Sequence, residues 1–395
     1  MDTSGELLLT INTGSSSLKA ALYEVGITPQ RRLSFDVSCI GTQAARVRIV
    51  GGGAVSERGE PVSDHSGALA ALMDWVGDEG YAPHLRGIGH RVVHGGPRYS
   101  EPQRVTSELI ETLRRLIPID PMHLPQAIGA IEAAQHAYPH IPQVACFDTA
   151  FHRQMPAVAQ MYPLPGEIVG DTIIRYGFHG LSYEYILREL GRIDPQAAAG
   201  RIIIAHLGNG ASMAAIRDGR DMDTTMGFSP TGGLVMGTRS GDLDPGVILY
   251  LMQGLGMTPA QVNDLLNKRS GLMGVSGKTS DMASLLSVGA TDERAREAVD
   301  LFCYSARKHV GALAAVLGGL DTLIFTGGIG EHAGPVRAEI CGDLGYLGLL
   351  VDPEENQRNA EIISSEESRV TVRVMKTDED EMIALHTQRA LSIGG

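Results

Sequence analysis

Aromatic residues, paired cysteines and long apolar runs are all scarce in this sequence. Aromatic residues make up 5% of its 395 residues, with one tryptophan, and its four cysteines are scattered without Cys-x-x-Cys spacing. Cysteines placed in this way predict small buried hydrophobic residues rather than disulfides or zinc ligands. No run reaches the roughly 18 apolar residues that a membrane-spanning helix needs, and the acidic N-terminus does not resemble a signal peptide. We therefore expect a cytoplasmic protein that does not enter a membrane.

Positive charge is also in short supply. The chain has 33 lysines and arginines against 46 aspartates and glutamates, which gives a formal net charge of −13 at pH 7. Such a surface repels nucleic-acid backbones and anionic lipid, so neither is an expected partner. Glycine, in contrast, is abundant: 49 residues, about 12% of the chain against a usual share of about 7%. This abundance indicates many places where the backbone bends tightly or approaches a ligand.

Strand-like and helix-like segments alternate along the chain, which predicts an α/β fold, and the length predicts two or three domains. Apolar runs predict strands at Leu7–Ile11, Ala20–Tyr23, Val47–Val50, Val144–Phe147, Arg201–Ala205, Met213–Arg217 and Thr322–Phe325. Apolar residues at helical spacing predict helices over Leu109–Ile117, after Thr258 and over Arg294–Leu317.

Two of these regions have the same design. Residues Leu7–Tyr23 contain a strand, a turn of small residues and a second strand, and Ile202–Arg217 repeat that order. Two like hairpins nearly half a chain apart indicate a duplicated domain. Each tip consists of small residues whose exposed amides would suit an anion. Two ordinary tight hairpins are the alternative interpretation.

A third glycine cluster, Gly327–Ala333, follows the strand at Thr322–Phe325. Its spacing fits the dinucleotide pattern Gly-x-Gly-x-x-Ala, but a single match is weak and this one lies late in the chain. A turn packed on the adenosine of a mononucleotide explains this cluster together with the two hairpins, so we favour it over a purely structural turn. Ser276–Thr279 is not a P-loop, because Leu272 stands where that motif needs glycine.

Several charged side chains stand in weakly polar, glycine-rich loops. Arg91 and Arg239 can each present a planar guanidinium to a carboxylate or phosphoryl group, although a pairing of Arg239 with Asp242 would be purely structural. Asp148 ends an apolar strand, where α/β proteins gather ligands, with a helix N-cap as the alternative. His179 lies in a glycine-flanked segment that suits ligand contact. No His, Asp and Glu set has zinc spacing, and the two arginines favour a small anionic substrate.

Seven segments carry a family resemblance: Asn12–Lys19, Gly89–Gly96, Phe147–His152, Arg175–Gly180, His206–Ser212, Met236–Asp242 and Gly327–Glu331. Together, in this order and over almost the whole chain, they resemble the acetate kinase family of the acetate/sugar kinase, Hsp70 and actin superfamily. The resemblance implies an α/β fold of two duplicated actin-like (ribonuclease H-like) domains with a nucleotide cleft between them. It also implies a homodimer.

The resemblance implies reversible transfer of the γ-phosphoryl group of ATP to acetate, which gives acetyl phosphate and ADP and needs Mg²⁺ or Mn²⁺. By matching positions it assigns catalysis to Arg91, Asp148, His179 and Arg239, and the metal to Asn12 and Glu379. The resemblance assigns substrate binding to Arg91 and to an apolar pocket for the methyl group, which consists of Val93, Met122, Phe178 and Pro230. It places the nucleotide at Lys19, His206, Leu207, Gly208, Asn209, Gly210, Asp281, Met282, Ala283, Gly327, Gly328, Ile329, Gly330, Glu331 and His332.

Physical chemistry refines the role of Asp148, which the resemblance implies to be an acid/base residue. A carboxylic acid substrate with a pKa of about 4–5 is already ionised at pH 7, so its attack needs no general base. Phosphoryl transfer depends mostly on positioning and on stabilising charge. We therefore expect Asp148 to orient Mg²⁺ or its waters, or to position an arginine.

This chain departs from the family pattern in four places. Ala283 replaces the arginine of Asp-x-Arg, Leu124 the asparagine of His-Asn-Pro, and Tyr183 the histidine of Thr-Ser-His. The usual Thr-Asn-Glu-Glu becomes Thr377–Asp380, which keeps Glu379. These changes leave the catalytic set intact and bear on nucleotide preference and rate.

The sequence also predicts where the two domains meet and which acyl substrates are used. We expect residues 1–150 and 381–395 to form the first domain and residues 151–380 the second.

A pocket separates substrates differing by one methylene by only about 1–3 kcal/mol, so propionate is an expected second substrate. A propionate or butyrate kinase of the same family is the alternative. A non-catalytic nucleotide-binding relative would need neither Arg91 nor Arg239, and a dehydrogenase built on Gly328–Ala333 is the remaining alternative.

Overall fold

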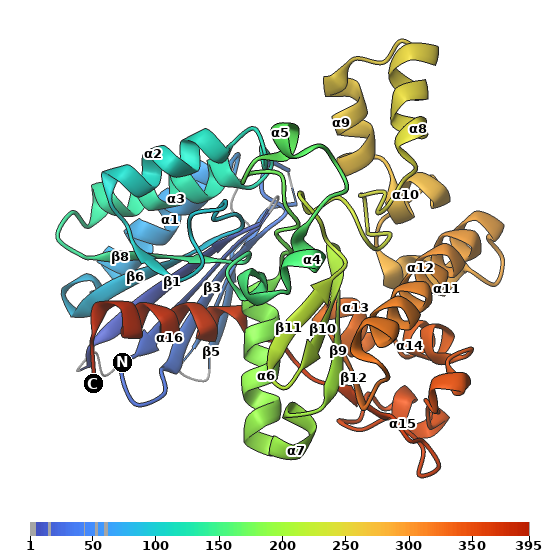
Figure 1. Ribbon diagram of the computed structural model, residues 1–395. Helices are drawn as coiled ribbons and strands as arrows, with labels where there is room; N and C mark the ends of the chain where they lie inside the picture. Colours follow the sequence, from blue (N-terminus) through green and yellow to red (C-terminus); the bar gives the residue numbers. More distant parts are fainter. Residues whose placement is uncertain (1–4, 15–16, 43, 52–53, 59–61, 395) are drawn as a thin grey trace. The chain divides into compact units, whose positions relative to one another are not determined.

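The computed structural model describes residues 5–14, 17–42, 44–51, 54–58 and 62–394, and the chain divides into two compact units (Figure 1). Unit 1 consists of Met1–Phe151 and Asp378–Gly395, and unit 2 of His152–Thr377. The sequence places these boundaries at residues 150 and 381.

Unit 1 is built on a mixed eight-stranded sheet with the order β5-β4-β3-β2-β1-β6-β8-β7. The strands are β1 (Leu7–Thr13), β2 (Leu18–Glu24), β3 (Gln30–Ser38), β4 (Arg46–Gly51), β5 (Ala54–Arg58), β6 (Leu85–Val92), β7 (Gln103–Arg104) and β8 (Gln143–Phe147). Strands β1 to β5 form an antiparallel meander, whereas β6 runs parallel to β1 and β8 parallel to β6. The sequence predicts four of these strands correctly.

Helices cover both faces of this sheet, as the alternation of side chains along β1 requires. The helices of unit 1 are α1 (His65–Asp78), α2 (Ser107–Leu116), α3 (Leu124–Ala137) and α16 (Glu379–Leu391). Leu9 and Ile11 are buried in one core with residues of α1 and α3, whereas Leu8 is buried in another with Ala384 of α16. Helix α16, from the end of the chain, thus completes the unit that the first residues begin.

Unit 2 contains a five-stranded sheet with the order β11-β10-β9-β12-β13. Its strands are β9 (Arg201–Leu207), β10 (Ala211–Arg217), β11 (Arg220–Thr224), β12 (Thr322–Thr326) and β13 (Thr371–Val374). Strands β9 to β11 are antiparallel, and β12 and β13 run parallel to β9. The order repeats β3-β2-β1-β6-β8 of unit 1, so the two hairpins recognised in the sequence occupy equivalent places in two sheets of the same plan.

The helices of unit 2 precede β9 or lie between β11 and β13. They are α4 (Ala157–Gln160), α5 (Gly166–Val169), α6 (Gly180–Ile193), α7 (Pro195–Ala198), α8 (Pro245–Leu249), α9 (Pro259–Lys268), α10 (Gly271–Ser276), α11 (Met282–Val288), α12 (Glu293–Leu317), α13 (Gly327–His332), α14 (Gly334–Cys341) and α15 (Pro353–Gln357). Thr258 and Gln261 form the capping box at α9 that the sequence predicts. Among the described helices, none is long and apolar enough to cross a membrane.

Candidate active site

Three neighbouring strands of unit 1 end at one group of polar side chains. Asn12 lies near the end of β1, Arg91 near the end of β6, and Asp148 directly after β8. Because these strands are parallel and adjacent, their carboxyl ends meet at the same edge of the sheet, which is where such sheets bind ligands. Glu379, in the first turn of α16, joins the group.

Arg91 is held by three of these side chains. Its Nη2 lies 2.6 Å from Asp148 Oδ2, and its Nε donates to both Asp148 oxygens at 3.1 Å. Its Nη1 donates to Asn12 Oδ1 at 3.1 Å, and the Asn12 amide donates to Glu379 Oε2, also at 3.1 Å. A bidentate pair of this kind fixes the plane of the guanidinium. The structure therefore presents Arg91 in one defined orientation.

The pKa shifts in this group follow from burial. Asp148 is completely buried, which raises its pKa, while the Arg91 guanidinium opposes the shift. Burial alone would lower the pKa of Arg91, but Asp148 and Glu379 raise it above its usual value. The Arg91 guanidinium therefore offsets part of the cost of burying the Asp148 charge.

The expected metal ligands, Asn12 and Glu379, offer oxygen atoms, which Mg²⁺ prefers. The neighbouring Asp380 has a buried Oδ1 without a hydrogen-bond partner, and burial raises its pKa to about 7. Among the described residues, no group of three or more His, Cys, Asp and Glu side chains could hold a metal. A Mg²⁺ ion at Asn12 and Glu379 would have to take its other ligands from phosphates and water.

The first hairpin tip is only partly described. Lys19 lies opposite Asn12 in the β1–β2 register and is exposed. Ser15 and Ser16, which belong to the proposed anion-binding tip, lie outside the described residues.

The second hairpin tip, in unit 2, is fully described. Gly208 N donates to Gly210 O at 3.0 Å, which closes the tip, and Gly237 N donates to Asn209 O at the same distance. Gly327, at the start of α13, has φ +77°, and a Cβ there would lie 2.8 Å from Leu207 O. Only glycine tolerates both conditions. Helix α13 therefore begins in direct contact with the end of β9.

His179 and Arg239 converge on this tip. A Cβ added to Gly210 would lie 3.3 Å from His179 Nε2 and 3.6 Å from Arg239 Nη1. The His179 ring stacks on His206 with 4.3 Å between centroids, and Arg239 Nη1 donates to Pro230 O at 2.9 Å. His179, His206 and Arg239 thus form one cluster at the second hairpin.

A cavity of about 500 Å³ lies beside the same hairpin. Its lining residues are Gly208, Asn209, Ser280, Asp281, Met282, Ala283, Leu286, Gly328, Ile329, His332, Ala333 and Pro335. Eight of these are expected nucleotide-binding residues, from three segments far apart in sequence. Lys19, His206, Leu207, Gly210, Gly327, Gly330 and Glu331 do not line this cavity.

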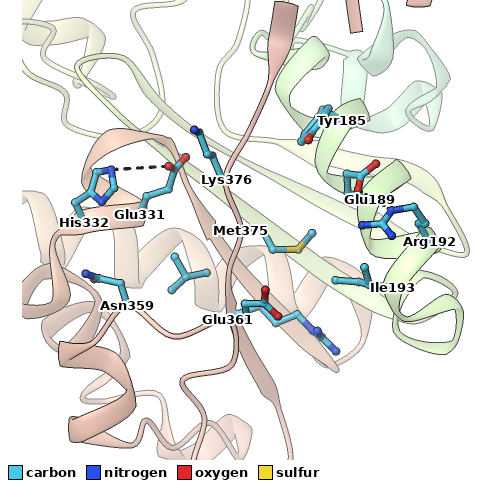
Figure 2. A pocket seen from close by; sticks show the side chains of 12 residues that line it. Tyr185, Glu189, Arg192, Ile193, Glu331, His332, Asn359, Glu361, Met375 and Lys376 are labelled. Carbon is cyan, nitrogen blue, oxygen red and sulfur yellow. Dashed lines mark hydrogen bonds and ion pairs between the residues drawn. The ribbon is translucent and has the colours of Figure 1, made fainter. Parts of the chain in front are cut away.

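Glu331 instead faces a second cavity, of about 590 Å³, between residues of α6 and the end of β13 (Figure 2). Its Oε1 accepts from Gly327 N at 3.0 Å and from Thr377 N at 3.3 Å. Glu331 therefore supports the start of α13. Two ion pairs lie at this cavity, Glu189 with Arg192 and Arg373 with Asp194.

The residues expected to form the apolar pocket belong to different units. Val93 and Met122 belong to unit 1, whereas Phe178 and Pro230 belong to unit 2. Val93, Phe178 and Pro230 are buried, and Met122 is half-buried. The catalytic set divides in the same way, with Arg91 and Asp148 in unit 1 and His179 and Arg239 in unit 2.

Comparison with known proteins decides the family. The model of the acetokinase family matches residues 7–385. The chain belongs to the acetokinase family. It is 44% identical over 392 residues to an acetate kinase of Methylocella silvestris, and the match covers 96% of each chain. It is 40% identical to a propionate kinase of Citrobacter rodentium, over 97% of this chain and 96% of that relative.

A solved structure supports the same assignment. The propionate kinase of Francisella tularensis matches with a TM-score of 0.91 and 35% identity, over 97% of this chain and 99% of that one. This likeness confirms the expected fold class, an α/β acetokinase fold of two actin-like domains.

One pair of buried residues in this acetokinase escaped the sequence analysis. His152 Nδ1 lies 2.6 Å from Asp221 Oδ2, and His152 Nε2 lies 2.9 Å from the carbonyl oxygen of Phe178. Because a carbonyl only accepts, Nε2 carries a proton. Burial raises the pKa of Asp221, and His152 opposes that shift. The pair fixes the peptide that precedes His179.

The sequence contained one signal for this pair. His152 ends one of the seven family segments, but nothing local pointed to Asp221, which is 69 residues away. The two meet because β11 carries Asp221 into the same core.

Proposed function

We propose that this acetokinase catalyses reversible transfer of the γ-phosphoryl group of ATP to acetate. The observation that carries the proposal is the fixed Arg91 guanidinium at the ends of β1, β6 and β8 in a chain of this family. Asp148 takes the Nε and Nη2 side of the guanidinium and Asn12 one N–H of Nη1, which leaves one N–H on each Nη for an anionic substrate.

The reaction needs no general base. An oxygen of the ionised carboxylate forms the new bond to the γ-phosphorus, while the bond to the β–γ bridging oxygen breaks and ADP leaves. Asp148 is engaged by Arg91 through both oxygens. Its role in this proposal is to hold Arg91 in position.

The second group of side chains suits the phosphates. Arg239 supplies positive charge and His179 a ring nitrogen at the Gly208–Gly210 tip. The cavity bounded by Asp281–Ala283 and Gly328–Ile329 has a volume suited to an adenosine group. Mg²⁺ held near Asn12 and Glu379 would neutralise phosphate charge when bound.

The choice of acyl group extends beyond acetate. Relatives bear the names acetate kinase and propionate kinase at 44% and 40% identity. One methylene is worth about 1–3 kcal/mol in an apolar pocket, so propionate serves as a weaker second substrate.

One assay tests the activity. Purified protein is mixed with ATP, MgCl₂ and acetate, propionate or butyrate, and acyl phosphate is trapped with hydroxylamine. We expect acyl hydroxamate with acetate, less with propionate and least with butyrate. A reaction without Mg²⁺ is the control for the metal. Absence of hydroxamate with all three acids would refute the proposal.

We also propose a homodimer in the cytoplasm. All four cysteines are described and are free thiols, three of them buried, as suits a reducing compartment. Helix α8 and the turn that follows it expose a set of large apolar side chains that favours association.

A further inference from the structure

Two hydroxyl groups connect Tyr183 to His179. His179 Nδ1 lies 2.9 Å from Ser212 Oγ, and the Tyr183 hydroxyl forms a hydrogen bond with the same Ser212 oxygen. Tyr183 lies in the first turn of α6 and Ser212 on β10, and both are fully buried. We name the three side chains the Tyr183–Ser212–His179 relay.

The chemistry of the three groups sets the direction of the relay. A phenol, with a pKa of about 10, is a stronger acid than an aliphatic alcohol, so Tyr183 donates and Ser212 accepts. The Ser212 proton is then directed to the basic Nδ1 of His179. Successive hydrogen bonds in a buried chain polarise and strengthen one another. In this arrangement Nδ1 accepts, and the ring proton of neutral His179 lies on Nε2.

The position of Nε2 shows what that proton does. Nε2 faces the Gly210 end of the hairpin tip, where Arg239 Nη1 also lies. An N–H there attracts a phosphoryl oxygen, whereas a ring lone pair there would repel one. The tautomer of His179 therefore decides whether its ring supports or opposes an anion at this place.

We propose that Tyr183, acting through Ser212, keeps the His179 proton on Nε2, so that His179 donates a hydrogen bond to the transferring phosphoryl group. The inference rests on the proposed function. Tyr183 and Ser212 are positioning residues, since they act through His179. His152 supports the relay, because its ring, fixed by Asp221, meets the Tyr183 ring edge-on at 5.5 Å. Tyr183 is also where this chain departs from the Thr-Ser-His pattern of its family.

Nitrogen NMR of the whole protein tests the tautomer without any substrate. With ¹⁵N-labelled histidine at pH 8, the His179 signals are identified by their loss in His179→Asn. We expect the neutral Nε2–H form in the wild type and a mixture with the Nδ1–H form in Tyr183→Phe, which keeps the ring. Tyr185→Phe, which removes a phenol hydroxyl two residues along α6, is the matched control and keeps the wild-type spectrum.

Kinetics tests the consequence. Losing one hydrogen bond of the relay changes the tautomer equilibrium severalfold, so kcat of Tyr183→Phe should fall about 5- to 10-fold with KM for ATP and acetate changed less than twofold. The kcat of Ser212→Ala should fall at least as far as that of Tyr183→Phe. Adding Tyr183→Phe to Ser212→Ala should cause no further loss of kcat, because the relay passes through Ser212.

The two arms separate this inference from the proposed function. Failure of the wild type to form acyl phosphate refutes the proposed function alone. A wild-type His179 that is protonated or in the Nδ1–H form overturns the relay, and so does a Tyr183→Phe spectrum identical to the wild type. Independent, additive effects of Tyr183→Phe and Ser212→Ala on kcat also overturn it.

Discussion

At the scale of single residues, Asp148 is the position where chemistry and structure constrain the interpretation most. An aspartate beside phosphoryl transfer invites the role of a base, but this one is fully buried and engaged by Arg91. The substrate it would deprotonate is already an anion at neutral pH. A residue whose charge fixes an arginine predicts different kinetics from a residue that removes a proton.

The variant Asp148→Asn distinguishes a positioning role of Asp148 from a role as a base. The amide keeps the size but loses the charge, so Arg91 turns toward Glu379, whose Oε2 is 3.8 Å from Arg91 Nε. A displacement of this kind costs about 100-fold in kcat, and we expect KM for acetate to rise with it. Thermal unfolding of the variant serves as the control for folding. Loss of activity with wild-type KM values and wild-type Mg²⁺ dependence would contradict the positioning role.

His90 gives a prediction for stability rather than activity. It is buried in β6, its Nε2 accepts a hydrogen bond from the Gln143 side-chain amide at 2.7 Å, and burial lowers its pKa from 6.5 to about 4. A depressed histidine pKa means that the folded state prefers the neutral ring. Its contribution to stability is therefore complete above pH 6.5 and is lost as the pH falls through 4.

The comparison of wild type with His90→Gln isolates this effect, because other titrating groups are common to both. We expect the free energy of unfolding of the wild type to fall by about 3 kcal/mol more than that of the variant between pH 7 and pH 4. Denaturant titrations at several pH values measure it. Parallel pH curves for the two proteins would show that His90 does not titrate in this range.

At the scale of elements, the two hairpins and the helices α2, α9 and α12 followed from local sequence patterns, because apolar spacing and capping residues act within a few positions. The capping box at Thr258 and the hairpin at Gly208–Gly210 are examples. Strands β3, β5, β6, β7, β11 and β13 were missed. Strand β6 contains Gly87 and Gly89, where a Cβ would overlap side chains of α16. These two glycines are required by the close packing of α16, and they interrupt the alternating apolar pattern by which a strand is predicted.

Helix α11 offers a prediction at this scale. Ala283, in the first turn of α11, lines the 500 Å³ cavity at the position where the family resemblance implies arginine. Ala283→Arg should lower KM for ATP about three- to fivefold, the value of one partly exposed charge pair with a phosphate. KM for acetate should stay unchanged.

The control for Ala283→Arg is Ser287→Arg. Ser287 is exposed on the same helix and does not line the cavity, so it adds the same charge elsewhere. An equal fall in KM for ATP in both variants would mean that the effect comes from net charge alone.

At the scale of the whole molecule, some features were predicted from sequence patterns and others only from the family resemblance. The repeated hairpins predicted the duplication that the two strand orders show. The return of the last helix to unit 1 had no local signal, since it depends on Leu8 and Ala384, which are 376 positions apart, and it came only from the resemblance. Contacts of that kind, like those of Asp221 with His152, are set by packing that no short segment records.

An exposed apolar surface around α8 bears on the expected dimer. Leu243, Val247, Leu249, Tyr250, Met252 and Leu255 are large apolar residues, each at least 36% exposed, in or beside α8 and the turn that follows. So many neighbouring apolar side chains in water are costly for a monomer, whereas a second copy of this chain would bury them.

Two charges in this surface should separate the copies. We expect Tyr250→Glu with Leu255→Glu to convert a dimer into a folded monomer, because each buried carboxylate would lie unpaired in an apolar interface. Sedimentation velocity measures the mass, and Ile27→Glu, which changes an exposed isoleucine of unit 1, is the matched control and should remain dimeric. A wild type that sediments as a monomer, or a double variant that stays a dimer, would show that this surface does not join two copies.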